Sequence, residues 1–138
     1  SIMMDMIYPV FTLVIFTFVV SAAVGTSRLL SVRRREINPR YYSLMTGDTP
    51  PDYVQKLGRN YANLLEMPVL FYLLGALVIA LDINHQALTN CAWLYVALRF
   101  VHSGIHITYN NAVHRLMVFV LSVLTLLTMW IQLFSLLG

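Results

Sequence analysis

Two long runs without a charged residue constrain what this chain can fold into. Met6–Ser27 contains no charged side chain over 22 positions, and Leu116–Gly138 contains none over 23 positions. A helix of either length crosses a bilayer core of about 30 Å. The whole chain is 59% hydrophobic and 11% charged, whereas typical soluble domains carry about 25% charged residues. The sequence therefore predicts an all-α integral membrane protein.

We expect one domain over residues 1–138, built as a bundle of four transmembrane helices at about 5–30, 52–81, 87–109 and 112–137. The two middle helices are less apolar than the ends. Met67–Leu81 offers 15 uncharged residues and Gln86–Leu98 only 13, so each crosses a bilayer only if its polar end is included. The alternative is a protein with two spans and a partly soluble middle. The arrangement of the charges by helical face favours four spans.

The basic residues are concentrated in the connection between the first two predicted helices. The second connection has no Lys or Arg. The first connection carries five cations, which are Arg33, Arg34, Arg35, Arg40 and Lys56. By the positive-inside rule, we expect the first and third connections to be cytoplasmic and both termini to face outward. Because membrane topology accounts for the basic residues, we expect no nucleic-acid partner. Asp5 precedes the first apolar run, which favours a membrane span there over a secretory signal.

Three polar residues form a stripe at the head of the second predicted helix. At 100° per residue, Asn63 lies about 40° and Glu66 about 20° from the direction of Arg59. Ionisable groups within a span are costly and usually face a bundle interior or a wet cavity. The stripe is therefore the first candidate for a functional site. Pro68 follows it and is expected to kink the helix just beyond Glu66.

A second set of polar residues lies on the third and fourth predicted helices. Arg99, His102 and His106 occupy positions i, i+3 and i+7 of the third helix. Arg115 stands at the start of the fourth helix, where unpaired backbone amides and the helix dipole favour an anion. Arg28 adds a cation near the end of the first helix. We expect these residues to meet the stripe at one end of the bundle.

The pooled residues form a cation-rich set with one carboxylate, Glu66. Such a site suits an anionic ligand with an ammonium group, since guanidinium forks pair with carboxylates. A purely structural network of paired charges is the alternative. His102 and His106 have a spacing that can bind a metal, but their neighbours are arginines, so no metal site is expected. The lone Cys91 is expected to be an inert packed thiol.

Two motifs carry a resemblance to a known family. The second predicted helix has the pattern basic-x2-Arg-x3-Asn-x2-Glu, and Arg99 is followed sixteen residues later by Arg115 across a short connection. With four predicted spans and a basic first connection, the chain resembles the MAPEG proteins, the membrane-associated proteins in eicosanoid and glutathione metabolism. The stretch HSGIHITYNNAVHR is most similar to a bacterial branch of that family, which implies a bacterial inner membrane.

The resemblance implies a homotrimer in membrane lipid, with glutathione as co-substrate bound between adjacent subunits on the cytoplasmic side. The implied activity is that of a glutathione transferase or peroxidase acting on hydrophobic or lipid electrophiles that arrive from the bilayer. Arg115 is implied to stabilise the glutathione thiolate. The implied glutathione-binding residues are Arg28, Arg59, Asn63, Glu66 and Arg99. From their place on the third predicted helix, His102 and His106 are expected to add contacts to the ligand.

The chain departs from the family pattern at two positions. Ala62 stands where members often carry a basic residue directly before the asparagine of the second helix. His106 stands where several members have a tyrosine, and Tyr109 is nearby but out of register. These departures leave two alternatives open. The chain could be a non-enzymatic trimeric module that binds lipid or a partner protein, or it could bind another small anion in the same cleft.

Overall fold

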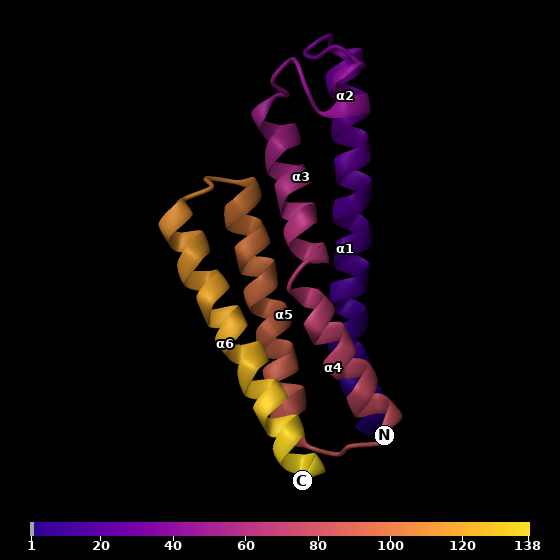
Figure 1. Cartoon of the computed structure of the whole chain (residues 1–138), viewed down its shortest axis with the longest axis vertical. Helices are drawn as coiled ribbons and strands as arrows, with labels where there is room; N and C mark the ends of the chain where they lie inside the picture. The colour runs from indigo at the N-terminus through magenta and orange to yellow at the C-terminus, as the bar shows by residue number, and fades with distance from the viewer. Residues whose placement is uncertain (1) are drawn as a thin grey trace.

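The computed structural model describes residues 2–138, and it describes side chains from residue 5 onward. Over this range the chain forms helices and no strand, which confirms the all-α prediction. The long helices pack side by side as a bundle (Figure 1). The helices are α1 (Ile2–Arg33), α2 (Tyr41–Leu44), α3 (Asp52–Leu65), α4 (Pro68–Ala80), α5 (Gln86–Ile107) and α6 (Ala112–Leu137).

The order of the helices places alternate connections at opposite ends of the bundle. Helix α1 packs against α3, α4 and α5, and α5 packs most extensively against α6. Both chain termini lie at one end in Figure 1, while the α1–α3 and α5–α6 connections lie toward the other end. The basic first connection and the start of α6 are therefore on the same side of the molecule.

The outer surface of the bundle is apolar. Three stretches are long and apolar enough to cross a membrane: Asp5–Arg33, Asp52–Ala80 and Ala112–Leu137. Large apolar side chains point away from the bundle, among them Phe18, which is 71% exposed, and Phe134, which is 80% exposed. A continuous apolar surface of this kind fits contact with lipid better than contact with water. Because the middle stretch qualifies as well as the two ends, the structure disfavours the alternative with two spans.

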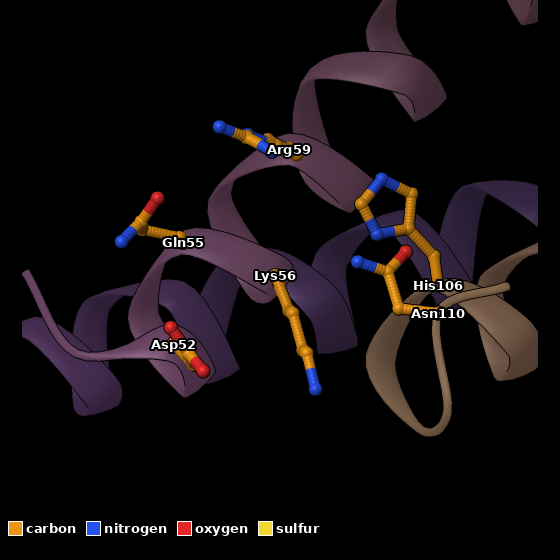
Figure 2. A pocket seen from close by; sticks show the side chains of 6 residues that line it. All are labelled: Asp52, Gln55, Lys56, Arg59, His106 and Asn110. Carbon is orange, nitrogen blue, oxygen red and sulfur yellow. The ribbon is translucent and has the colours of Figure 1, made fainter. Parts of the chain in front are cut away.

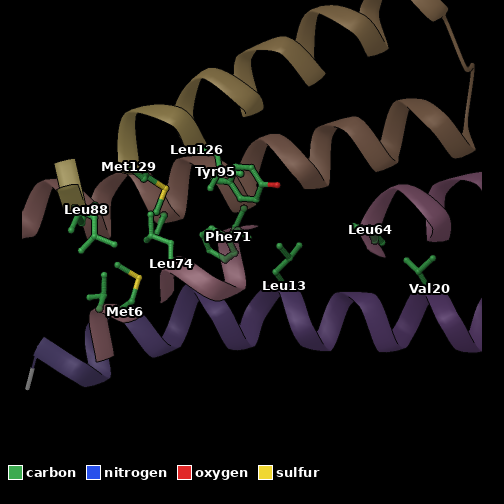
Figure 3. Close-up of a cluster of buried hydrophobic side chains, with 14 of the residues drawn as sticks. Met6, Leu13, Val20, Leu64, Phe71, Leu74, Leu88, Tyr95, Leu126 and Met129 are labelled. Carbon is green, nitrogen blue, oxygen red and sulfur yellow. The ribbon is translucent and has the colours of Figure 1, made fainter. Parts of the chain in front are cut away.

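A cluster of buried apolar side chains from five helices fills the bundle interior (Figure 3). Leu13 of α1 and Met129 of α6 have no exposed surface. Phe71 of α4 stacks on Tyr95 of α5, with ring centroids 4.7 Å apart and planes 19° apart. This stacking fixes α4 against α5 one helical turn before Arg99.

The second predicted helix is divided into α3 and α4. Helix α3 ends at Leu65, and Glu66 has φ −90° and ψ −95°, outside the helical region. Helix α4 begins at Pro68, which occupies one of its first positions. Proline has no N–H and cannot donate to the carbonyl four residues earlier. The predicted kink is therefore confirmed and takes the form of a complete break between Leu65 and Pro68.

Candidate functional site

The first cavity of the site lies between α1, α2 and α3 and is lined by two cations. Arg28 and Arg59 line a cavity of about 230 Å³ together with Tyr42. The guanidinium of Arg28 lies over the Tyr42 ring, 5.5 Å from its centroid. The Tyr42 hydroxyl is 2.8 Å from the Ser31 hydroxyl, which ties α2 to the end of α1. Two guanidinium groups facing one cavity favour an anionic ligand group.

Tyr42 was not predicted as a site residue, because no regular structure was expected in the first connection. Helix α2 is one turn long and places the Tyr42 ring against Arg28. The sequence feature that could have indicated this contact is the pair of adjacent tyrosines, Tyr41 and Tyr42, within a basic segment. Aromatic faces attract guanidinium groups, so a tyrosine close to Arg28 in the chain was a candidate partner.

A second cavity lies on the other side of Arg59, between α3 and the end of α5 (Figure 2). Its volume is about 160 Å³, and its walls are Asp52, Gln55, Lys56, Arg59, His106 and Asn110. The Lys56 ammonium donates a hydrogen bond to the Thr108 carbonyl over 3.1 Å. Arg59 is exposed and lines both this cavity and the first one. The Arg59 side chain can therefore contact a ligand group in either of these two cavities.

The third cavity is lined by Arg115, the residue to which the family resemblance assigns the catalytic role. Arg115, His102 and Asn63 line a cavity of about 390 Å³. One terminal nitrogen of Arg115, Nη1, lies 3.1 Å from Nε2 of His106. Arginine has only donors, so Nε2 accepts this hydrogen bond and His106 is a neutral ring with its proton on Nδ1. His106 therefore holds the guanidinium of Arg115 at the cavity wall.

The fourth cavity continues from the third toward the start of α4. It has a volume of about 490 Å³ and is lined by Asn63, Glu66, Met67, Val69, Leu70 and Phe119. Asn63 and Phe119 are shared with the cavity that contains Arg115. Glu66 is exposed. The two cavities together form a groove that is cationic at Arg115 and apolar along α4, with Phe119 where they meet.

Arg99 differs from the other cations of the site because it is fully buried. Its exposed fraction is 0%, and those of His102 and His106 on the same helix are 4% and 1%. Its Nη2 donates a hydrogen bond to the backbone carbonyl of Asn63 over 3.2 Å. The expected contact between the third predicted helix and the stripe is therefore made by Arg99, and it reaches the backbone of Asn63 rather than its side chain.

The start of α6 differs from the expectation of unpaired amides. The side chain of Asn111 caps the helix, and its Oδ1 accepts hydrogen bonds from the backbone N–H groups of Val113 and His114, each over 3.0 Å. The prediction that these amides are free for an anion is wrong, since an asparagine before a helix satisfies them. The helix dipole and Arg115 remain as the sources of positive potential.

Seven of the eight predicted site residues are thus distributed over adjoining cavities rather than gathered in one, and the eighth, Arg99, is buried and lines none of these cavities. Arg28 and Arg59 share one cavity, Arg59 and His106 a second, and Asn63 lies between Arg115 and Glu66. Arg28 and Arg115 line different cavities. Within the part of the chain that the structure describes, no group of three or more His, Cys, Asp or Glu side chains could hold a metal ion.

A buried residue that the sequence pattern did not single out is Asn60. It has no exposed surface, and its amide nitrogen and oxygen have no hydrogen-bond partner among the residues described. Asn60 follows Arg59 directly and so lies about 100° from Arg59 and about 60° from Asn63 around the helix, which is why the helical-face pattern did not include it.

The sequence matches the model of the MAPEG family over residues 6–135. Comparisons with curated proteins and with solved structures gave no match. The family match covers nearly all of the 138 residues, from the first apolar run within α1 to the last turn of α6. The chain is therefore an integral membrane protein that belongs to the MAPEG family.

Proposed function

We propose that this protein is a membrane glutathione transferase or peroxidase that activates the glutathione thiol against hydrophobic or lipid electrophiles. The family includes enzymes of both kinds. The observation that carries the proposal is Arg115, which is held by His106 and lines a cavity that continues into an apolar groove. In this proposal the protein is a homotrimer with four spans per protomer in a bacterial inner membrane, and its first and third connections are cytoplasmic.

The stripe on α3 supplies groups that match the polar ends of glutathione. Glutathione carries two carboxylates and one ammonium group. Arg28 and Arg59 are placed to pair with carboxylates, the exposed Glu66 with the ammonium group, and the Asn63 side chain with a peptide group. Because these residues line adjoining cavities along α3, an extended tripeptide would lie along this helix, with a neighbouring protomer closing the site.

Arg115 would act on the sulfur. A thiol has an unperturbed pKa of about 8.5, so little of it is ionised at pH 7. A guanidinium and a helix N-terminus beside the sulfur favour the thiolate, and each unit by which the thiol pKa falls corresponds to about 1.4 kcal/mol. The thiol proton is released to water. His106 accepts a hydrogen bond from Arg115 and so keeps the cation in place for this step.

Two reactions are open to the thiolate. In transfer, the sulfur electron pair forms a carbon–sulfur bond with an electrophilic carbon, and the leaving group departs with its own electron pair. In peroxide reduction, the sulfur attacks the terminal oxygen of a lipid hydroperoxide and the O–O bond breaks. The lipid alkoxide takes up a proton to become the alcohol. A second glutathione then reduces the resulting sulfenic acid, which yields glutathione disulfide and water.

The test is stopped-flow absorbance of the thiolate when glutathione is added to the purified trimer. Wild type should show a thiolate signal at millimolar glutathione, and Arg115→Ala should abolish it while the trimer stays assembled. Arg40→Ala is a matched control, because it removes an exposed guanidinium in the first connection. An intact wild-type trimer without a signal would refute the proposal. Equal loss of assembly and signal in Arg115→Ala would assign Arg115 a structural role.

A non-enzymatic membrane module is the second candidate function. It is favoured by the burial of Arg99, His102 and His106 inside the protomer, which suits a polar network that locks helices together. In that case Arg59→Ala and Glu66→Ala would change trimer stability with strong coupling and leave glutathione binding absent throughout. Native mass spectrometry of the detergent-extracted protein would then show lipid or a partner protein in the cleft, and no glutathione.

A further inference from the structure

The break between α3 and α4 leaves the carbonyl of Asn63 without its helical partner. In a continuous helix this carbonyl accepts a hydrogen bond from the N–H four residues later, at Met67. The backbone of Glu66 leaves the helical region at ψ −95°, so the pattern stops there. The carbonyl instead accepts from the Glu66 N–H over 3.4 Å, which is longer than the usual range of about 2.7–3.2 Å.

A backbone carbonyl with only one long hydrogen bond is unfavourable within a membrane span, since no water is there to replace the lost donor. Arg99 of α5 supplies that donor. Its Nη2 reaches the Asn63 carbonyl over 3.2 Å, so a side chain from the neighbouring helix takes the place of the missing backbone N–H. The hydrogen bond crosses from α5 to the last turn of α3, directly before the break.

The burial of Arg99 separates it from the residues that can touch a ligand. Its exposed fraction is 0% in a single protomer, and added subunits can only lower exposure further. Neither of the two cavities lined by Asn63 has Arg99 in its wall. A ligand could reach the Arg99 guanidinium only if α3 and α5 moved apart.

We propose that Arg99 is a positioning residue that holds the end of α3 and thereby sets the direction of Asn63 and Glu66. It acts on the ligand through the backbone of Asn63 and does not touch the ligand. The effect on glutathione rests on the proposed function, whereas the bond between Arg99 and the broken helix does not. Since Asn63 is shared by the cavity of Arg115 and the apolar groove, a shift of α3 would change both.

The sequence allows the carbonyl of Asn63 to be observed alone. Asn63–Leu64 is the one place in the 138 residues where leucine follows asparagine. Labelling asparagine with ¹³C at the carbonyl and leucine with ¹⁵N therefore gives a single correlation peak in an NMR spectrum of the detergent-solubilised protein. Loss of a hydrogen bond moves a carbonyl carbon upfield, so the position of this peak reports the contact with Arg99 in the absence of any ligand.

In Arg99→Met we expect the Asn63 carbonyl peak to move upfield. In Arg99→Lys, which keeps a hydrogen-bond donor on a flexible side chain, the peak should lie between its positions in Arg99→Met and in wild type. Lys56→Met is the matched control, because it removes another bond from a cation to a backbone carbonyl near the end of α5, away from the break. Its Asn63 peak should stay in place. If Arg99→Met does not fold, Arg99→Lys carries the same test.

Glutathione affinity should fall about tenfold in Arg99→Met, a change of about 1.4 kcal/mol, while the thiol pKa of bound glutathione stays at its wild-type value. An unmoved Asn63 peak overturns the proposal whatever happens to affinity, and lost affinity with an unmoved peak would show direct contact with the ligand. If the peak moves but wild type binds no glutathione, the hydrogen bond to the break is supported and the proposed function fails.

Discussion

Gly75 of α4 lies directly against α1, and its replacement by alanine gives the sharpest test of the packing. Gly75 is buried within α4, and a Cβ added there would lie 2.7 Å from the Cγ2 atom of Val10 on α1. Carbon atoms in contact prefer about 3.5–4.0 Å, so the atoms must separate by about 1 Å. Val10 is β-branched and has few alternative rotamers. The two helices therefore have to move apart.

Two opposing effects determine the size of the change. Overpacking of this kind costs about 1–3 kcal/mol, while alanine is favoured over glycine within a helix by about 1 kcal/mol. We expect Gly75→Ala to lower the free energy of unfolding by about 1 kcal/mol, taking about 2 kcal/mol for the clash. In a Val10→Ala background the clash is absent, so the same change should raise stability. The coupling between the two sites should be about 2 kcal/mol.

The assay is reversible unfolding in mixed micelles of a mild detergent and SDS, with helicity as the readout for all four members of the cycle. Gly25→Ala is the control, because Gly25 lies within α1 and an added Cβ there has no neighbour within 4 Å. That variant should be neutral or stabilising. A coupling near zero between Gly75 and Val10 would refute the reasoning, because the cost of Gly75→Ala would then not come from this contact.

Three further predictions concern the end of the bundle near Arg115. His106→Phe removes the acceptor that holds Arg115, at a cost of about 1 kcal/mol. A less fixed cation stabilises the thiolate less, so the pKa of the glutathione thiol should rise by somewhat under one unit and a pH titration of thiolate absorbance should shift to higher pH. Asn111→Ala removes the cap of α6 and should cost about 1 kcal/mol of stability, measured by thermal unfolding. Phe119→Ala widens the groove where the cavities of about 390 and 490 Å³ meet and should raise kcat/KM for bulky electrophiles relative to small ones, while glutathione affinity stays unchanged.

The membrane character and the helical class were predictable because they depend on composition along the chain. The charge-free runs at the two ends need no knowledge of neighbouring helices to be recognised as spans. The kink at Pro68 was also local, since the missing N–H is a property of the residue itself. Its extent was not predictable, because the hydrogen bond from Arg99 to the Asn63 carbonyl at the break comes from another helix.

The distribution of the site residues depended on tertiary contacts that the sequence does not encode locally. The helical period placed Arg59, Asn63 and Glu66 on one face; Arg59 and Asn63 do lie along α3, whereas Glu66 lies just beyond its end, outside the helical region. The helical period does not show how deeply each of these side chains is buried within the bundle. It could not show that Arg59 lies between two cavities, or that Tyr42 reaches Arg28 from a one-turn helix in the first connection.

The difference between Arg99 and Arg115 follows from this argument. The two residues are sixteen positions apart and carry the same charge, so a sequence pattern assigns both to one cation-rich site. In the structure Arg115 lines a cavity and bonds to a side chain, whereas Arg99 is fully buried and bonds to a backbone carbonyl. A buried guanidinium is too costly to persist without good hydrogen bonds, and the broken helix offers one. The break therefore creates the acceptor for Nη2 of Arg99, directly beside the exposed Glu66.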